Sequence, residues 1–469
     1  MLSQVAGLPE NSWWLASRNA FHEVWTPAAQ RPLNRGRSAE PSRLITAWGG
    51  FAWDSKRSSL WLFGGGHGDY SGNDVYVWQA QDGRWQRAAL PSEIRRDEHG
   101  IEMAIDGVDM APIASHTYDN NVYLPRLDRL LSFGGAAYNN GDAWRRSTAD
   151  GKVVRTGPYL FDVARADGSK LGGSSGSQVQ REPNAPAPEG AQLWQNRDSY
   201  EAPQEGTLTP SNHVNGCTAY SEENAEDVVY VAARVGKGTA LNLFRYRILD
   251  IAKPTADSWQ HVGGYWQGPS DQTACGYDPV HQLLVRTGSS KAPFLFWSLQ
   301  QPGPENRQQV MPYTDTDGSF KRALAQKRFR PRDCGLDYDR KRNRFALWCG
   351  GQAVWVLAPS ADTSKATATD MSNKGTPKSA PGNETSTTNT ELTASTADIA
   401  DDSESRTPWR LSLLPDHSLM IPEPERGNGV LGKWHYAPEL DVFVALQNGR
   451  EGLVWFYKPA NWQPENSCP

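Results

Sequence analysis

The chain has 469 residues, a length typical of about three domains, although some all-β architectures reach it as one unit. Its 48 Lys and Arg residues against 53 Asp and Glu residues give a formal net charge of −5, which excludes a global attraction to a nucleic-acid backbone. No apolar run reaches the roughly 18 residues of a membrane span, and the first ten residues lack the pattern of a signal peptide. The 43 glycines and 32 prolines disfavour long helices.

A short pattern recurs along the chain: an aromatic residue, a polar stretch, an apolar run and a glycine. In three copies the aromatic residue and the glycine are 11 residues apart. We call the first residue of each copy an anchor aromatic; including three looser copies, these are Trp53, Tyr123, Tyr220, Tyr277, Tyr338 and Tyr436. Each copy predicts a β-hairpin with a polar turn.

Further strand signals follow each hairpin. After Gly64-Gly65 come an aromatic strand at 73–78, an Asp-Gly turn and Trp85, which predict a third and a fourth strand. Similar fourth strands are expected around Trp259 and Trp409. Four antiparallel strands in each repeat are typical of a propeller blade.

The first repeat, with its double glycine, aromatic strand and spaced tryptophan, resembles a kelch repeat. Gly134-Gly135 and Gly350-Gly351 repeat the double glycine, whereas Gly288 is single. We therefore expect an all-β fold, with residues 1–469 forming a single kelch-like β-propeller of six or seven four-stranded blades. Strands from the N- and C-termini are expected to share a blade and close the ring, with residues 11–25 as the N-terminal contribution.

Two segments interrupt the repeats. Residues 174–210 are rich in proline, glycine, serine and glutamine and predict a long surface loop. Residues 359–407 are a low-complexity segment without aromatic residues, so they cannot bury enough apolar surface to fold alone and are expected to be disordered.

In a propeller, the loops that lead into the inner strands and those that join second to third strands lie on one face, where ligands usually bind. Four of the nine histidines fall at these positions. The candidate catalytic residues there are His116, Tyr118, His67, His213 and Arg332. The candidate substrate-binding residues are Trp48, Tyr70, Asn215, Asp271, Asp333, Lys433 and His435.

These residue types suit β-elimination on a uronate-containing polysaccharide. Histidine can act as a general base, tyrosine can protonate a leaving oxygen, and arginine can hold a carboxylate through two hydrogen bonds. The set resembles that of propeller-fold polysaccharide lyases such as the ulvan lyases, in fold and residue types rather than in a local motif. The resemblance implies His116 or His67 as the base, Tyr118 as the acid, Arg332 as the carboxylate clamp and His213 as an orienting partner.

Other interpretations stay open. Asp271 and Asp333 could form a carboxylate pair for glycoside hydrolysis, although aspartate is also common in turns. No cofactor is expected, although the stretch 67–74 could hold a structural metal ion. A kelch-like propeller could also be non-catalytic and bind a protein or a glycan, as a cell-surface or phage-tail component. The expected partner is a polysaccharide or glycan, or else a protein, and not a nucleic acid.

The five cysteines form neither a zinc spacing nor a disulfide scaffold. Cys217, Cys275 and Cys334 precede anchor aromatics at similar distances, which predicts small buried core residues. Cys334 and Cys349 flank one hairpin and could form a disulfide, which would indicate an oxidising compartment. We expect an extracellular or periplasmic location for a bacterial or phage protein, with no signal peptide in this chain.

Overall fold

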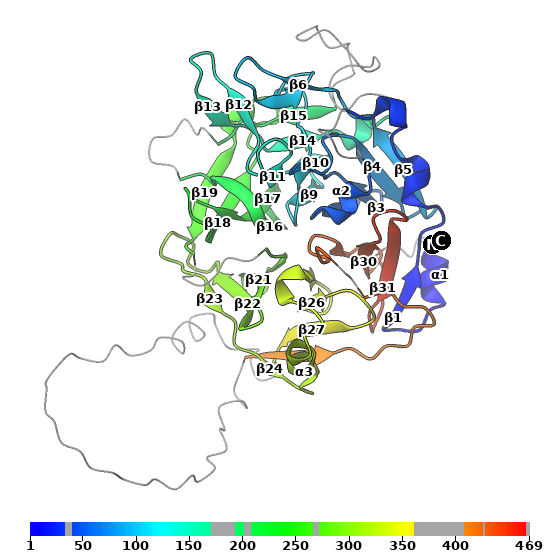
Figure 1. The fold of residues 1–469 in the computed structure, drawn as a ribbon. Coiled ribbons are helices and arrows are strands. Elements are labelled where there is room, and N and C mark those ends of the chain that lie inside the picture. The colour runs from blue at the N-terminus through cyan, green and yellow to red at the C-terminus, as the bar shows by residue number, and fades with distance from the viewer. Residues whose placement is uncertain are drawn as a thin grey trace, which may run out of the picture.

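Six sheets surround a common axis as the blades of a β-propeller (Figure 1). The computed structural model describes residues 1–32, 40–169, 193–200, 208–265, 272–360, 408–424 and 427–465. The predicted all-β propeller is confirmed, and the described residues form six blades rather than seven. No helix in these ranges is long and apolar enough to cross a membrane.

Each blade places its first strand against the axis, where neighbouring first strands contact one another in chain order. The inner strands are β2 (Phe51–Asp54), β9 (Asn121–Leu124), β16 (Asn212–Glu223), β20 (Cys275–Asp278), β25 (Gly335–Asp339) and β29 (Trp434–Ala437), in blades 1 to 6. In the same blade order, the second strands are β3 (Ser59–Leu62), β10 (Arg129–Ser132), β17 (Glu226–Arg234), β21 (Leu283–Ser289), β26 (Arg344–Trp348) and β30 (Val442–Gln447). The third strands are β4 (Val75–Gln79), β14 (Tyr159–Phe161), β18 (Leu241–Arg247), β22 (Ala292–Ser298), β27 (Val354–Pro359) and β31 (Leu453–Lys458). The outer strands are β5 (Arg84–Ala89), β15 (Trp194–Asn196), β19 (Ser258–Gly263), β23 (Gln309–Val310), β28 (Trp409–Leu413) and β1 (Ser12–Leu15).

Short elements decorate this frame. Three two-stranded sheets pair β6 (Ile94–Arg96) with β7 (Glu102–Ala104), β8 (Ser115–His116) with β11 (Ala136–Ala137), and β12 (Arg145–Ser147) with β13 (Val153–Arg155), and β24 (Thr314–Asp315) adds a parallel edge to blade 5. The helices are α1 (Leu2–Ala6), α2 (Arg43–Thr46) and α3 (Ser319–Ala325), with short 3-10 turns at Phe21–Val24, Ala28–Gln30, Val163–Arg165, Pro254–Ala256 and Pro331–Asp333.

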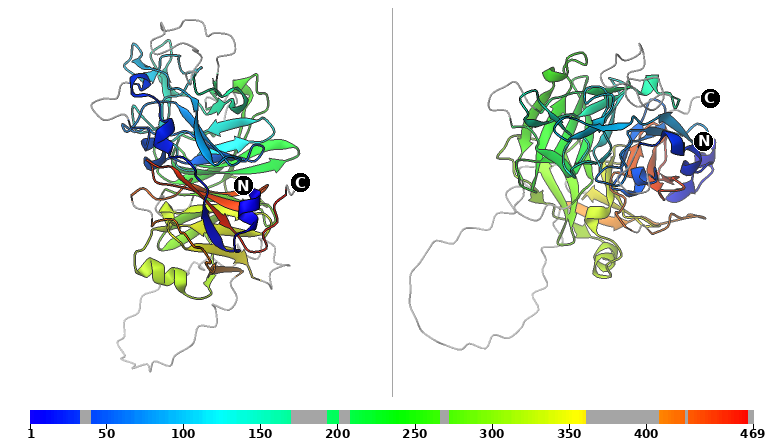
Figure 2. Two further views of the ribbon diagram at one scale, coloured as in Figure 1. Left: turned by 90° about the vertical axis from the view of Figure 1, so that its right-hand side faces the viewer. Right: turned by 45° about the horizontal axis from the view of Figure 1, so that its top comes forward.

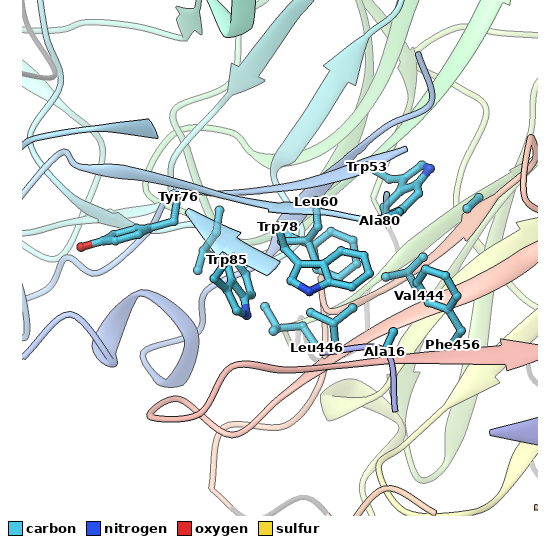
Figure 3. Close-up of a cluster of buried hydrophobic side chains, with 14 of the residues drawn as sticks. Ala16, Trp53, Leu60, Tyr76, Trp78, Ala80, Trp85, Val444, Leu446 and Phe456 are labelled. Atoms are coloured by element: carbon cyan, nitrogen blue, oxygen red, sulfur yellow. The ribbon is translucent and has the colours of Figure 1, made fainter. Parts of the chain in front are cut away.

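The ring closes as expected, because the N-terminal strand β1 pairs with the C-terminal strand β31. Ser12 lies opposite Lys458 and Leu15 opposite Trp455, and the two strands run side by side at the edge of the molecule (Figures 1 and 2). Side chains of blades 1 and 6 then share one core, in which Trp78 meets Phe456 with ring centroids 5.7 Å apart (Figure 3). Burial of each such large apolar side chain contributes about 2 kcal/mol, so this seam is a substantial fraction of the net stability.

The polar turns that follow the anchor aromatics also join neighbouring blades. The Asp339 carboxylate caps its own turn by accepting the backbone N–H of Arg342. The Arg342 guanidinium bonds to Asp339 in blade 5 and, through two parallel bonds of 2.8 and 2.7 Å, to Asp441 in blade 6. Arg57 repeats the arrangement between Asp54 of blade 1 and Asp128 of blade 2.

The two predicted insertions have different outcomes. Residues 361–407 lie outside the described residues, so the prediction of disorder there stays a prediction. Segment 174–210 is described only at 193–200 and 208–210, and it is not loop throughout: Trp194–Asn196 forms β15, the outer strand of blade 2. The hydrophobic pattern of three residues was too short to reveal this strand within a Pro- and Gly-rich stretch.

The cysteine prediction is wrong in one part. Cys217 and Cys275 are buried, but they form a disulfide that joins the inner strands of blades 3 and 4. Cys334 and Cys349 form a second disulfide across the β25–β26 hairpin, with Cα atoms 4.2 Å apart, as their spacing suggested. Strands in different blades become neighbours only when the ring closes, so spacing along the chain could not reveal the first pair.

The substitution Arg342→Ala should lower the free energy of unfolding by about 3 kcal/mol, because it removes the guanidinium that pairs with the buried Asp441 and leaves Asp339 with Arg344 alone. Chemical denaturation measures the effect. The control is Arg126→Ala, whose pair with Glu222 is half-exposed on both sides and should contribute less than about 1 kcal/mol. Equal losses in the two variants would contradict a special role for the buried bridge.

Candidate functional site

We call the face on which the inner strands begin the start face and the opposite face the end face. On the start face, His67, His116 and Tyr118 lie together, as the sequence suggested. The His67 and His116 rings are 5.3 Å apart, and the His116 and Tyr118 rings 6.1 Å apart. Trp48 packs on His116 at 4.9 Å, so four of the predicted residues form one group, which we call the His–Tyr cluster.

The loop after β3 positions His67. Gly66 has φ +83° and accepts no side chain, because a Cβ there would lie 2.4 Å from backbone atoms of Ser115 and His116. This close approach brings the loop against β8 and leaves His67 exposed with φ +40°. Gly141 supports it from the other side, since a Cβ at Gly141 would collide with the His67 ring.

A second glycine supports Tyr118. A Cβ on Gly135 would lie 2.7 Å from the Tyr118 ring, so the glycine pair after β10 makes room for this side chain. Tyr118 has φ +49°, and its backbone N–H donates to the carbonyl of Trp48 over 2.6 Å. The indole N–H of Trp48 in turn donates to Gln272 of blade 4 over 2.9 Å. The cluster therefore rests on contacts between blades.

Burial sets the protonation of the cluster. The His116 side chain is 1% exposed, and this burial lowers its pKa although Asp69 lies 3.3 Å from Nε2. His116 is thus neutral near pH 7. Burial raises the pKa of Tyr118 to about 12, so its phenol keeps its proton. His67 is the exposed member of the cluster, Trp48 is half-buried, and His116 and Tyr118 are buried and need a rearrangement to meet a substrate.

Three charged residues surround the cluster: Asp69, which the sequence placed only in the possible metal stretch 67–74, and Arg43 and Arg234, which sequence reasoning missed. Asp69 bonds to His116 and also faces Arg43, whose Nε lies 3.8 Å from Oδ1 and whose side chain is 49% exposed. Arg234, at the end of β17, lies close enough to Tyr118 to act on its pKa. Asp69 lies two residues after His67, so its position in the same loop indicated that it lies near the site. Arg43 and Arg234 come from other parts of the chain, and no sequence pattern connected them to the site.

Two predicted residues are held in the protein interior. His213 is buried, bonds to the Tyr200 hydroxyl at 2.7 Å and packs on Phe133 and Trp259; burial lowers its pKa to about 3. Nothing in the described contacts joins it to the His–Tyr cluster. Tyr70 is fully buried in the core between blades 1 and 6 and is not available to a substrate.

The remaining predicted residues are spread over the start face. Asp333 bonds to Gln272 and pairs with Arg330, and Arg332 lies 3.8 Å from Asp333. Asp333 connects to the cluster through Gln272 and Trp48. Lys433 is buried and donates to the carbonyl of Gly429. Asn215 is half-buried with φ +63°, and Asp271 lies outside the described residues.

His435 belongs to a different site, inside the ring. Its Nδ1 lies 3.5 Å from Asp337 Oδ2 and its Nε2 3.7 Å from Asp119 Oδ1. Burial lowers the pKa of His435, but the two carboxylates outweigh it and the net shift is upward. Burial raises the pKa of Asp119 to about 7.

His435 and Asp337 line a cavity of about 310 Å³ that reaches toward the end face. All six anchor aromatics also line it. The repeated residue that revealed the blades is therefore also the repeated wall of this central cavity. Within the described residues, no group of three or more His, Cys, Asp or Glu side chains is placed to hold a metal ion.

Comparisons with known proteins find matches among solved structures. No family model and no curated protein matches the sequence. Solved structures that match include the Dos1 propeller (8% identity, 98% of this chain and 97% of that chain, TM-score 0.33) and the WD40 domain of Toxoplasma gondii coronin (9%, 97% and 88%, 0.32). The propeller domain of Myceliophthora thermophila Cps50 (Swd1) matches at 10% identity over 63% and 92%, with a TM-score of 0.24. These values carry no argument about function.

The buried Asp119–His435 pair makes stability depend on pH. Both groups hold a proton more tightly when folded than when unfolded, so stability falls as pH rises, for Asp119 between about pH 4 and pH 7. Asp119→Asn should flatten this part of the curve while Asn still accepts the Cys275 N–H, as measured by denaturant midpoints across pH. Glu98→Gln, at a side chain that is 82% exposed, serves as control, and an Asp119→Asn curve parallel to the native one would refute the assignment.

Proposed function

We propose that the protein is a carbohydrate-active propeller that cleaves an acidic, uronate-containing polysaccharide by β-elimination at the His–Tyr cluster. One observation carries the proposal: an exposed histidine, a protonated tyrosine and an exposed arginine gather around His116 on the start face. These are the base, the acid and the carboxylate clamp that the reaction needs.

The geometry favours one division of roles among those that the sequence left open. His67 is exposed and takes the proton from the carbon next to the uronate carboxylate. Tyr118 is buried, so its hydroxyl must become accessible when the substrate binds; it then gives a proton to the glycosidic oxygen as the C–O bond breaks and a C=C bond forms. Arg43 holds the carboxylate in place of Arg332, because Arg43 faces Asp69 next to His116, whereas Arg332 lies beside Asp333. Neutral His116 is a positioning residue, since it packs against both His67 and Tyr118.

Two further features support the wider proposal. The double glycine Gly64-Gly65 lies just before His67 in the chain, and Gly135 of the second double glycine contacts the backbone of His116, in keeping with the kelch-like repeat. Two disulfides are typical of proteins in oxidising compartments, which fits an extracellular or periplasmic enzyme acting on a polymer. The alternative is a non-catalytic propeller that binds a glycan or a protein through the same face.

The test is incubation with a panel of uronate polysaccharides, followed by ultraviolet absorbance of the unsaturated product. His67→Ala and Tyr118→Phe should each lower kcat by at least about a hundredfold, the usual contribution of a general base or acid. Arg43→Ala should mainly raise KM, because it removes binding of the carboxylate before and during the reaction.

His99→Ala is the matched control, because His99 is a partly exposed histidine at the turn between β6 and β7 and should leave activity unchanged. If the native protein forms no unsaturated product from any polysaccharide in the panel but still binds one, the lyase proposal is refuted and the binding alternative holds. Full activity of His67→Ala would refute the assignment of the base.

A further inference from the structure

The central cavity is unused by the proposed lyase, because it opens toward the opposite end of the ring. Its rim consists of the turns after the inner strands, including Ser55, Pro125, Glu222 and Arg340. Its wall consists of the six anchor aromatics. A volume of about 310 Å³ is at the lower end of what small-ligand pockets have, so the occupant would be a small molecule.

The phenol groups of the wall are already engaged elsewhere. The hydroxyls of Tyr123, Tyr220 and Tyr436 donate to Asp128, Asp227 and Asp441 in the polar turns. Burial and these carboxylates raise the pKa of each phenol, so the rings stay neutral. Trp53, Tyr123, Tyr338 and Tyr436 are buried between blades, so the aromatic surface offered to the cavity comes from the half-buried rings of Tyr220 and Tyr277. The negative face of such a ring attracts cations.

One positively charged side chain of the protein already packs on an aromatic ring at the rim of the cavity. The guanidinium of Arg340 lies 6.0 Å from the centre of the Tyr220 ring, within the range of a cation–π contact. The ring of aromatic residues thus already faces one positive group, supplied by the chain itself.

The exposed carboxylate deep in the cavity is that of Asp337, whose side chain is 25% exposed. It lies 3.5 Å from His435, which in turn lies 3.7 Å from the buried Asp119. At the rim, Glu222 and Arg340 balance each other. The other lining side chains contributed by β2, β9, β16 and β20 are neutral.

We propose that the central cavity binds a small organic cation, an ammonium group carried on carbon, between the anchor aromatics and the carboxylate of Asp337. The aromatic wall replaces the hydration of the carbon atoms, and Asp337 supplies the countercharge.

The experiment is calorimetric titration of the whole protein with choline and with its neutral isostere, in which a tert-butyl group replaces the trimethylammonium group. Choline should bind at one site and the isostere at least about tenfold more weakly, a difference of about 1.4 kcal/mol. Equal binding of the two, or no binding of choline, would overturn the proposal.

Two variants of opposite charge sharpen the test. Asp337→Asn should weaken choline binding about tenfold, and Arg340→Gln should strengthen it, because a like charge leaves the rim. Asp150→Asn, far from the cavity lining, should change nothing. The reverse signs would indicate an anion site, and no change in either variant a neutral ligand; both outcomes refute the proposal. Because polysaccharide cleavage is measured separately, failure here leaves the lyase proposal untouched.

Discussion

Closure of the ring is the constraint on which the rest of the structure depends. A four-stranded blade cannot bury both of its faces alone, and stacking each blade on the next removes both faces from water. The last gap is filled by β1 from the N-terminus, which pairs with β31 and brings the cores of blades 1 and 6 together. Only then do the six inner strands surround an axis and create two distinct faces.

The two faces use this frame in different ways. On the end face, the turns are short and charged, and arginines such as Arg57 and Arg342 join one blade to the next through buried aspartates. On the start face, longer connections bring β8 and the loop after β3 into contact, which places two histidines and a tyrosine side by side. Ion pairs between blades are thus found at the end face, and the His–Tyr cluster at the start face.

Both proposed sites combine residues that repeat in every blade with residues that occur in one blade alone. The anchor aromatics repeat in every blade and so form a wall around the axis. Asp337 and His435 interrupt that uniform wall and give it a charge. Likewise, Gly66 and Gly135 occur where the backbone must pass close to a neighbouring segment, and both lie beneath members of the His–Tyr cluster.

Sequence reasoning identified features that depend on neighbours along the chain. The hairpins, the anchor aromatics and the terminal closure follow from local patterns, and His116 with Tyr118 follow from their spacing of two residues. His213 illustrates the limit: its position in an inner strand was correctly anticipated, but its partner Tyr200 comes from a segment expected to be loop. Arg43 and Arg234 were missed because each reaches the cluster from a different blade or connection.

By itself, the sequence determined the all-β class, the propeller architecture, the inner hairpin of each blade and the way the ring closes, because alternation, turn chemistry and repeat length act locally. Only the tertiary structure decided the number of blades, the Cys217–Cys275 disulfide and the Asp119–His435–Asp337 group, since each joins residues that are far apart until six blades stack. It also separated the exposed His67 from the buried His116 and His213, because burial depends on what the neighbouring blades place over each ring.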